Sequence, residues 1–225
     1  MGFVSFMSEG RPSYGVWLDE ANWLQVPAAF QAEHPDLRSV IAADRLDELD
    51  ALTRQSGQRV SASQAQLLPV IPHPGKVVCV GLNYKTHVAE TKRNDSEYPA
   101  LFIRFADSLN AHGADLPRPS NTQRFDFEGE LAVVIGRGGR HIAPEQAFEH
   151  IAGYACFNDA TARDWQRHTH QWTAGKNFPG TGPLGPFLAT RREVPDVTAL
   201  SLQTRLNGQV MQQASLADLI FTLPV

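Results

Sequence analysis

Apolar and polar positions change period along the first part of the chain, and the change separates strand-like from helix-like segments. Residues 4–8 and 15–18 are short apolar-rich runs on either side of Glu9-Gly10-Arg11-Pro12, which predicts a β-hairpin. Across residues 37–56 the apolar positions recur with a period of about 3.6, which predicts a helix. The chain is therefore expected to begin with a small α+β unit.

A stretch rich in proline and glycine predicts a domain boundary. Residues 67–75 contain three prolines and one glycine, which exclude a regular helix or a central strand. We therefore expect a small N-terminal domain over residues 1–72 and a larger domain over residues 73–225.

The larger part is predicted to be rich in β-structure. Asn207-Gly208 is a strong hairpin signal, and the glycines and prolines of residues 175–186 predict an ordered loop. The predicted fold class is mixed, β-rich α+β. We expect strands at residues 76–81 (buried), 101–105, 127–135, 202–206 and 209–212, and helices at residues 144–151 and from about 158 to about 168.

Composition narrows the function classes. The 225 residues are 42% hydrophobic and 20% charged, which is typical of a globular protein with a real core. The net charge of −4 argues against a nucleic-acid binder, which usually has a basic surface. No apolar run is long enough to span a membrane, and the N-terminus does not resemble a signal peptide. Because Cys79 and Cys156 have no paired spacing, we expect reduced thiols and a cytoplasmic protein.

Three carboxylates alternate at the start of an apolar segment. On a strand, Asp126, Glu128 and Glu130 share one face, and residues 131–135 continue the segment into the interior. Carboxylates at such a place repel one another and lose hydration unless something neutralises them. A hard divalent cation with oxygen ligands would do so. The alternative is an acidic strand edge that pairs with distant arginines.

Asp159 stands where the second predicted helix begins. Its plainest role there is that of an N-cap. Arg163, Gln166 and His170 follow at offsets of four, seven and eleven, so they share one stripe of a helix with Asp159. A polar stripe of this kind is typical of a surface that faces a ligand, although polar helix faces are also common. His168 and His170 are expected to be exposed rather than zinc ligands.

Three further residues have side chains that suit acid–base or charge-stabilising chemistry. His87 and Glu90 are three residues apart and would be neighbours on a helical turn, where the carboxylate raises the basicity of the imidazole. Lys176 follows a glycine in a loop that could bring its ammonium to a substrate oxyanion. The plainer alternatives are an ordinary surface pair and a solvated lysine.

The order of these segments resembles the fumarylacetoacetate hydrolase family from about residue 76 to the last residue. Single motifs are weak, whereas their order and spacing together are specific. The matching motifs are Val80-Gly81-Leu82-Asn83-Tyr84 with His87 and Glu90; Pro99-Ala100-Leu101-Phe102; Asp126-Phe127-Glu128-Gly129-Glu130-Leu131 before Val134-Ile135-Gly136; Gly153-Tyr154 with Asn158-Asp159 and Arg163-Asp164; Gly175-Lys176; Gly182-Pro183-Leu184-Gly185-Pro186; and Asn207-Gly208.

The resemblance implies a fold, a cofactor and a set of site residues. It implies a mixed β-roll domain in which Glu128, Glu130 and Asp159 bind Mg²⁺ or Mn²⁺. It implies that His87, supported by Glu90, activates water and that Lys176 stabilises developing negative charge. The substrate-binding residues that it implies are Tyr84, Arg104, Arg163 and Gln166.

Three departures from the family pattern matter. Val80 occupies the place of a further metal-binding aspartate of the eukaryotic hydrolase, and Arg104 stands where many members carry lysine. The sequence stops at Val225. Members of the family usually have a further C-terminal segment, which contains a Pro-Gly-Asp and a Thr-Gly-Thr-Pro motif and completes the pocket. We therefore expect either a truncated chain or a natural fragment, and such a fragment could be inactive.

The resemblance implies an enzyme that cleaves a carbon–carbon bond in acylpyruvate-like 2,4-dioxo acids. The same metal and enolate chemistry also serves hydratases, tautomerases, isomerases and oxaloacetate decarboxylases, which a shared fold does not separate. Two alternatives come from other classes of protein. They are a metal-dependent nuclease and a non-catalytic binding protein. The partners expected are a small 2-oxo acid and a second copy in a homodimer, with no nucleic acid and no membrane.

Overall fold

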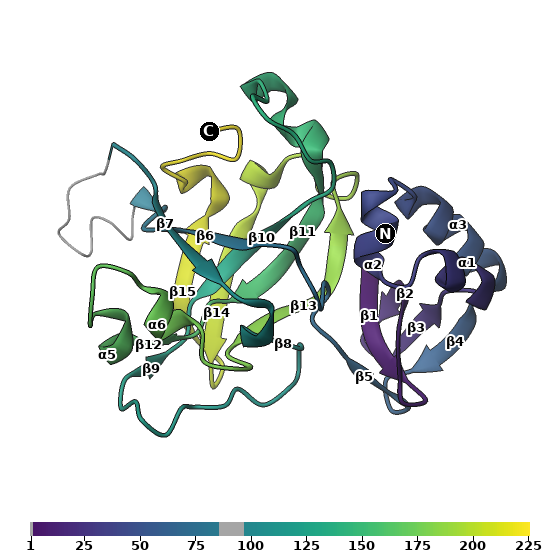
Figure 1. Cartoon of the computed structure of the whole chain (residues 1–225), viewed down its shortest axis with the longest axis horizontal. Helices are drawn as coiled ribbons and strands as arrows, with labels where there is room; N and C mark the ends of the chain where they lie inside the picture. Colours follow the sequence, from purple (N-terminus) through teal and green to yellow (C-terminus); the bar gives the residue numbers. More distant parts are fainter. Residues whose placement is uncertain (1, 86–96) are drawn as a thin grey trace.

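The computed structural model describes residues 2–85 and 97–225 (Figure 1). The described part is organised around a nine-stranded sheet with the order β10-β11-β13-β1-β2-β3-β4, in which β5 pairs with β1 and β8 with β13. Its strands are β1 Gly2–Ser8, β2 Arg11–Asp19, β3 Asn22–Gln25, β4 Gln58–Ser61, β5 Ala65–Leu67, β8 Leu109–Asn110, β10 Gly129–Ile135, β11 Ile151–Asn158 and β13 Gly182–Thr190.

The N-terminal lobe, residues 2–67 on the right in Figure 1, has the predicted hairpin and a helical region where one helix was predicted. Strands β1 and β2 pair antiparallel up to Ser8 and Arg11. The helical segment is divided into α2 (Leu37–Ala42) and α3 (Leu46–Ser56), and the short helix α1 (Ala28–Glu33) precedes them. The apolar period thus located α2 and α3, but neither the break between them nor α1.

Three two-stranded sheets complete the β-structure. They pair β6 (Val77–Gly81) with β7 (Ala100–Arg104), β9 (Phe125–Asp126) with β12 (Thr161–Ala162), and β14 (Ser201–Leu206) with β15 (Gln209–Ser215). Asn207 and Gly208 both have positive φ, 51° and 81°, so the predicted hairpin turn is confirmed. The predicted α+β class is confirmed as well.

The remaining helical segments are short, and one predicted helix is wrong. Instead of a helix from about residue 158 to 168, β11 extends to Asn158, and only α5 (Arg163–Gln166) is helical. Strand pairing prevails here because Thr161 pairs with Asp126. The others are α6 (Thr173–Lys176) and the 3₁₀ helices η1 (Ala106–Ser108), η2 (Pro144–His150), η3 (Val197–Ala199) and η4 (Leu216–Asp218).

The loop predicted at residues 175–186 is also wrong in part, since β13 begins at Gly182 and occupies a central position in the sheet. Prolines are rare in central strands because they lack an N–H. Pro186 is accommodated where the register between β11 and β13 shifts, between the Cys156↔Gly185 and Tyr154↔Ala189 pairs. An interruption in the ladder removes the cost of the missing donor.

The two predicted domains share one sheet and one core. Gly2 and Phe3 of β1 pair with Ala189 and Leu188 of β13. Phe3, Tyr14 and Leu37 from the first part belong to the same buried cluster as Leu184 and Leu188 from the second. The division at residue 72 stays a prediction.

Strand β6 is a strand as predicted, but the expected burial is wrong, since none of its five residues is fully buried. Its side chains alternate, so Val78 and Val80 are 57% and 44% exposed. They pair in register with Ile103 and Leu101 of β7, which are 45% and 59% exposed. The face formed by these four residues is called the β6–β7 apolar face below. No helix of the described residues is long and apolar enough to cross a membrane.

Candidate functional site

Two of the three predicted metal carboxylates are brought together by the pairing of β10 with β11. Glu128 directly precedes β10, Asp159 directly follows β11, and the register pairs Gly129 with Asn158. The backbone N–H of Asp159 donates to the carbonyl of Glu128 at 2.8 Å. Residues 31 positions apart in the sequence therefore lie side by side.

Lys176 bridges the two carboxylates. Its Nζ lies 2.8 Å from Glu128 Oε2 and 2.6 Å from Asp159 Oδ2, and the residue is 1% exposed. Gly175 permits this placement, since a Cβ there would stand 2.7 Å from the carbonyl oxygen of Ala162. The lysine is thus a buried cation of the site rather than a solvated loop residue.

Arg163 pairs with the carboxylates that precede β10. Its Nη2 lies 2.8 Å from Asp126 Oδ2, and its Nη1 pairs with Glu128 Oε1. The same Nη1 donates to Gln166 Oε1 at 3.2 Å. Although burial alone would raise the pKa of Glu128, Lys176 and Arg163 hold this pKa below its ordinary value. Glu128 therefore has two cationic partners, Lys176 and Arg163. Pairing with distant arginines was the alternative to a metal ion that the sequence left open.

Arg104 is buried beneath Asp159. Its side chain is wholly unexposed, and its Nη1 lies 2.6 Å from Asp159 Oδ1. Its Nη2 donates to Thr181 Oγ1 at 2.9 Å and its Nε to Ser108 Oγ at 3.2 Å. The structure thus places this predicted substrate-binding residue behind a carboxylate, where it contacts the protein on several sides.

Glu130 differs from the other two carboxylates because no described residue donates a hydrogen bond to its side chain or forms an ion pair with it. Burial, and then the charges of Glu128 and Asp159, raise its pKa to about 8. Burial first and Glu130 second also raise the pKa of Tyr84. Glu130 and Tyr84 therefore lie near the ion-paired side chains, which are called the charged cluster below. They are Arg104, Glu128, Asp159, Arg163 and Lys176.

His87 and Glu90, the predicted catalytic pair, lie outside the described residues. The structure brings together the predicted residues Glu128, Asp159, Lys176, Arg104 and Arg163 by direct contacts, with Gln166 beside Arg163 and Glu130 and Tyr84 nearby. The roles assigned to all ten residues stay predictions.

The fit of a divalent cation depends on these carboxylates. As they stand, no three acidic, histidine or cysteine side chains of the described residues are arranged so that they could hold a metal ion. Glu128 and Asp159 instead face Lys176. The donor chemistry nevertheless fits, because Glu130 is a half-buried carboxylate that feels the charges of Glu128 and Asp159 and lacks a hydrogen-bonding partner among the described residues. A cation shared by the three would relieve that repulsion.

Two contacts of the site were missed from the sequence. Thr161 Oγ1 donates to Glu128 Oε1 at 3.1 Å, and Cys79 lies close enough to the cluster that Asp159, after burial, raises its pKa to about 12. The alternation along β6 points Cys79 away from the exposed face of Val78 and Val80, and it could have identified the cysteine as an inward position. Nothing in the sequence indicated the Thr161 contact.

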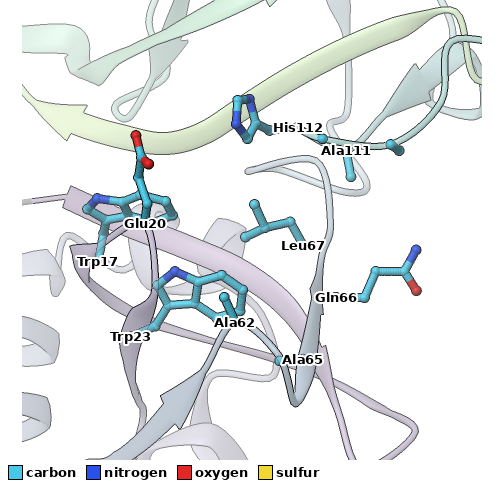
Figure 2. Close-up of a pocket in the computed structure, with 11 residues that line it drawn as sticks. Trp17, Glu20, Trp23, Ala62, Ala65, Gln66, Leu67, Ala111 and His112 are labelled. Atoms are coloured by element: carbon cyan, nitrogen blue, oxygen red, sulfur yellow. The ribbon is translucent and has the colours of Figure 1, made fainter.

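The hollow in Figure 2 is not this site. It has a volume of about 400 Å³ and lies against the N-terminal lobe. Trp17, Trp23 and Glu20 line one side, and Leu67 and His112 lie across from them. None of the carboxylates or cations of the charged cluster lines it. The chemistry of the buried charges, rather than the size of this hollow, identifies the candidate site.

Comparison with known proteins gives a consistent answer. The family model described as fumarylacetoacetate (FAA) hydrolase C-terminal matches residues 76–225. The chain is 37% identical over 169 residues to the oxaloacetate tautomerase YisK of Bacillus subtilis, covering 73% of this chain and 56% of that protein. It is 39% identical over 161 residues to the human mitochondrial oxaloacetate tautomerase FAHD2A, covering 71% of this chain and 51% of that protein.

Solved structures of the same fold cover the whole chain. One is a fumarylacetoacetate hydrolase from the psychrophilic Exiguobacterium antarcticum, with a TM-score of 0.78 and 30% identity, covering 100% of this chain and 78% of that one. A maleylpyruvate hydrolase from Sphingobium sp. SYK-6, in complex with manganese(II) ion and pyruvate, has a TM-score of 0.76 and 21% identity, covering 100% and 80%. The chain spans about half of the length of the two tautomerases.

Proposed function

Since this chain belongs to the fumarylacetoacetate hydrolase family, as its motifs predicted, we propose that it interconverts the keto and enol forms of a small 2-oxo acid of the oxaloacetate type. The similarity to two oxaloacetate tautomerases, at 37% and 39% identity, is the observation that carries the choice of reaction. Tautomerisation was one of the alternatives that the sequence left open.

The buried cations supply the central physical requirement of this reaction. Converting a ketone into its enol passes through an enolate, whose negative charge must be stabilised in a site with little water. Lys176 is a buried ammonium, and Arg163 lies beside it at Glu128. Their positive charges favour a 2-oxo acid, which is itself an anion, and they orient its carboxylate.

Glu128, Glu130 and Asp159 are the residues proposed to hold Mg²⁺ or Mn²⁺. When bound, such an ion supplies Lewis-acid stabilisation of the charge on the substrate oxygen. The maleylpyruvate hydrolase of the same fold binds manganese, which supports a divalent metal without fixing which one this chain uses. Tyr84, beside Glu130, and Gln166, beside Arg163, are proposed to line the substrate side.

His87 with Glu90 is proposed to move the proton. This part of the proposal rests on the sequence alone, because both residues lie outside the described residues. A carboxylate three residues from an imidazole on a helical turn raises the basicity of the imidazole. In a tautomerase, the imidazole would take the proton from the carbon next to the carbonyl and deliver it to the carbonyl oxygen, and the reverse reaction would move it back to the carbon.

Hydrolysis of acylpyruvates is the second candidate. It is favoured by the 30% identity to a fumarylacetoacetate hydrolase that the whole chain matches in structure. The two reactions share the enolate and differ in the attack by water on a second carbonyl. The same His87 would activate that water.

A direct assay separates the candidates. With Mg²⁺ or Mn²⁺ present, the purified chain is expected to speed the decay of the ultraviolet absorbance of enol-oxaloacetate without releasing pyruvate. Loss of the diketone absorbance of acetylpyruvate would instead identify the hydrolase, and pyruvate from oxaloacetate a decarboxylase. If a folded chain changes neither enol-oxaloacetate nor acetylpyruvate and releases no pyruvate from oxaloacetate, the proposal is contradicted.

We also propose that the chain forms a homodimer through the β6–β7 apolar face. Four large apolar side chains exposed on paired strands are unusual on a monomer surface and typical of interfaces. Light scattering should therefore give twice the mass of one chain, and Leu101→Lys should halve it. A monomer in the unaltered protein would contradict this assignment.

A further inference from the structure

Lys176 is the last residue of α6, a helix of only four residues. A single helical turn is not stable by itself in water, so contacts with other elements must hold it in place. The ammonium nevertheless lies at 2.6 and 2.8 Å from two carboxylate oxygens, and the residue is 1% exposed. The position of Lys176 is therefore set by the elements against which α6 packs.

The N-terminal end of α6 packs against strand β7 through aromatic rings. The ring centroids of Trp172, which precedes α6, and Phe102 of β7 lie 5.4 Å apart. The centre of the Phe102 ring also lies 4.9 Å from Lys176 Nζ. Gly81 of β6 leaves room for the indole, because a Cβ at this position would collide with the Trp172 ring. Strand β7 is accordingly the surface on which α6 lies.

The C-terminal end of α6 is fastened to β7 by the side chain of Asn177. Its Oδ1 accepts from the backbone N–H of Phe105 at 2.7 Å, and its Nδ2 donates to the carbonyl of Ile103 at 3.0 Å. An adjacent strand would bond the same kind of N–H and carbonyl, so the amide takes the place of a strand at this edge of β7. Nδ2 also donates to the carbonyl of Thr173, the first residue of α6, at 3.0 Å. One amide thus ties both ends of α6 to β7.

We propose that Asn177 is a positioning residue, which holds the Lys176 ammonium at the place from which it stabilises the enolate. The two residues are adjacent, so a shift of the Asn177 amide along β7 moves Lys176 with it. The inference rests on the proposed function for the role of Lys176, whereas the placement of the ammonium does not depend on the reaction. Loss of the amide leaves the contact between Trp172 and Phe102 in place, so the chain keeps its fold while Lys176 loses its fixed position.

Steady-state kinetics of Asn177→Ala with enol-oxaloacetate, alone and combined with Lys176→Met, test the inference. In the single variant kcat should fall by about 10- to 100-fold, since a displacement of about 1 Å has an effect of this size. KM should stay the same, because the interaction with the enolate is made in the transition state. In the Lys176→Met background the same change should have no further effect on kcat, because the two residues act as a unit.

Asn110→Ala is the matched control. Asn110 also uses its whole amide on the backbone, since Nδ2 donates to the carbonyls of Asp115 and Gly180 and Oδ1 accepts from the N–H of Ala111. These bonds involve neither α6 nor β7. Asn110→Ala should therefore leave kcat unchanged, although it removes the same kinds of hydrogen bond.

If Asn177→Ala does not fold, as judged by circular dichroism, Asn177→Asp carries the test. The carboxylate keeps an acceptor for the N–H of Phe105 and loses both donated bonds. An unchanged kcat in the folded variants, or an equal loss in both backgrounds, would overturn the inference.

The proposed function can fail separately. If the unaltered chain converts no 2-oxo acid, the proposed function is wrong, and a crystal structure of the Asn177 variant decides the inference alone. Displacement of Lys176 from Glu128 or Asp159 would support it. Lys176 still bridging both carboxylates would overturn it.

Discussion

The N-terminal lobe and the charged cluster are both buried, but they bury opposite kinds of side chain. In the lobe, Phe6 and Trp23 pack with ring centroids 5.2 Å apart beside Val4 and Val60. In the cluster, Lys176 and Arg104 neutralise carboxylates at hydrogen-bonding distance. Apolar burial stabilises a fold directly, whereas buried charges lose hydration that their attraction does not reliably restore. The lobe is therefore built for stability and the cluster is retained for chemistry.

The largest effect should come from Lys176→Met. It removes a buried ammonium that contacts both Glu128 and Asp159, and it leaves the carboxylates with less compensation. We expect catalysis to fall about 10²- to 10³-fold, as for other groups that stabilise an oxyanion, and stability to fall by about 3–5 kcal/mol. Steady-state kinetics and chemical denaturation measure the two. The exposed Lys76→Met is the control, and equal kinetics of both variants would contradict a special role for Lys176.

Leu49→Ala should affect stability alone. Leu49 is fully buried in the core that contains Phe30 and Val40. Truncating such a side chain costs about 2–5 kcal/mol. A thermal melt should show the loss, while the turnover of the folded fraction stays the same. If the turnover fell together with stability, the separation between a stabilising lobe and a chemical cluster would be wrong.

Glu130 should give the chain a pH-dependent stability when a chelator is present. Its pKa is raised from 4.5 to about 8, so the folded state keeps a proton that the unfolded chain has lost. The stabilisation is complete below pH 4.5 and disappears as the pH rises through 8, with a slope of about 1.4 kcal/mol per pH unit between them. Denaturation curves across this window should show the decline, and Glu130→Gln should flatten it. The decline should also be smaller with Mn²⁺ present. An identical slope in the unaltered chain and in Glu130→Gln would count against the assignment.

Trp23→Phe should have the smallest effect. The indole Nε1 is buried and has no hydrogen-bonding partner among the described residues. Removing an unsatisfied donor offsets part of the packing lost with the larger ring. The free energy of unfolding should change by less than about 1 kcal/mol, which urea denaturation can resolve. A loss of several kcal/mol would mean that the N–H has a partner in solution.

The sequence predicted those parts of the fold that local patterns determine. The hairpin of residues 2–19, the helical segment after Asp36 and the turn at Asn207-Gly208 each depend on neighbours in the chain, and each is confirmed. The helix expected from residue 158 and the loop expected up to Pro186 failed for another reason. Both segments join strands that are distant in sequence, and pairing across β9, β11 and β13 outweighs local propensity.

The site was predictable as a set of residue types but not as a set of contacts. Alternation and the family motifs indicated Glu128, Asp159 and Lys176, which the structure brings into contact. The contact between Arg104 and Asp159 could not be foreseen, because the two residues are 55 positions apart in the chain. Only the three-dimensional pairing of strands places a wholly buried guanidinium there.

The most direct test is a crystal of this chain grown with Mn²⁺ and examined by anomalous scattering. The account predicts one strong peak in direct contact with single carboxylate oxygens of Glu128, Glu130 and Asp159, with Lys176 displaced from one of its two acceptors. A peak elsewhere, or no peak with Lys176 still bridging Glu128 and Asp159, would contradict it.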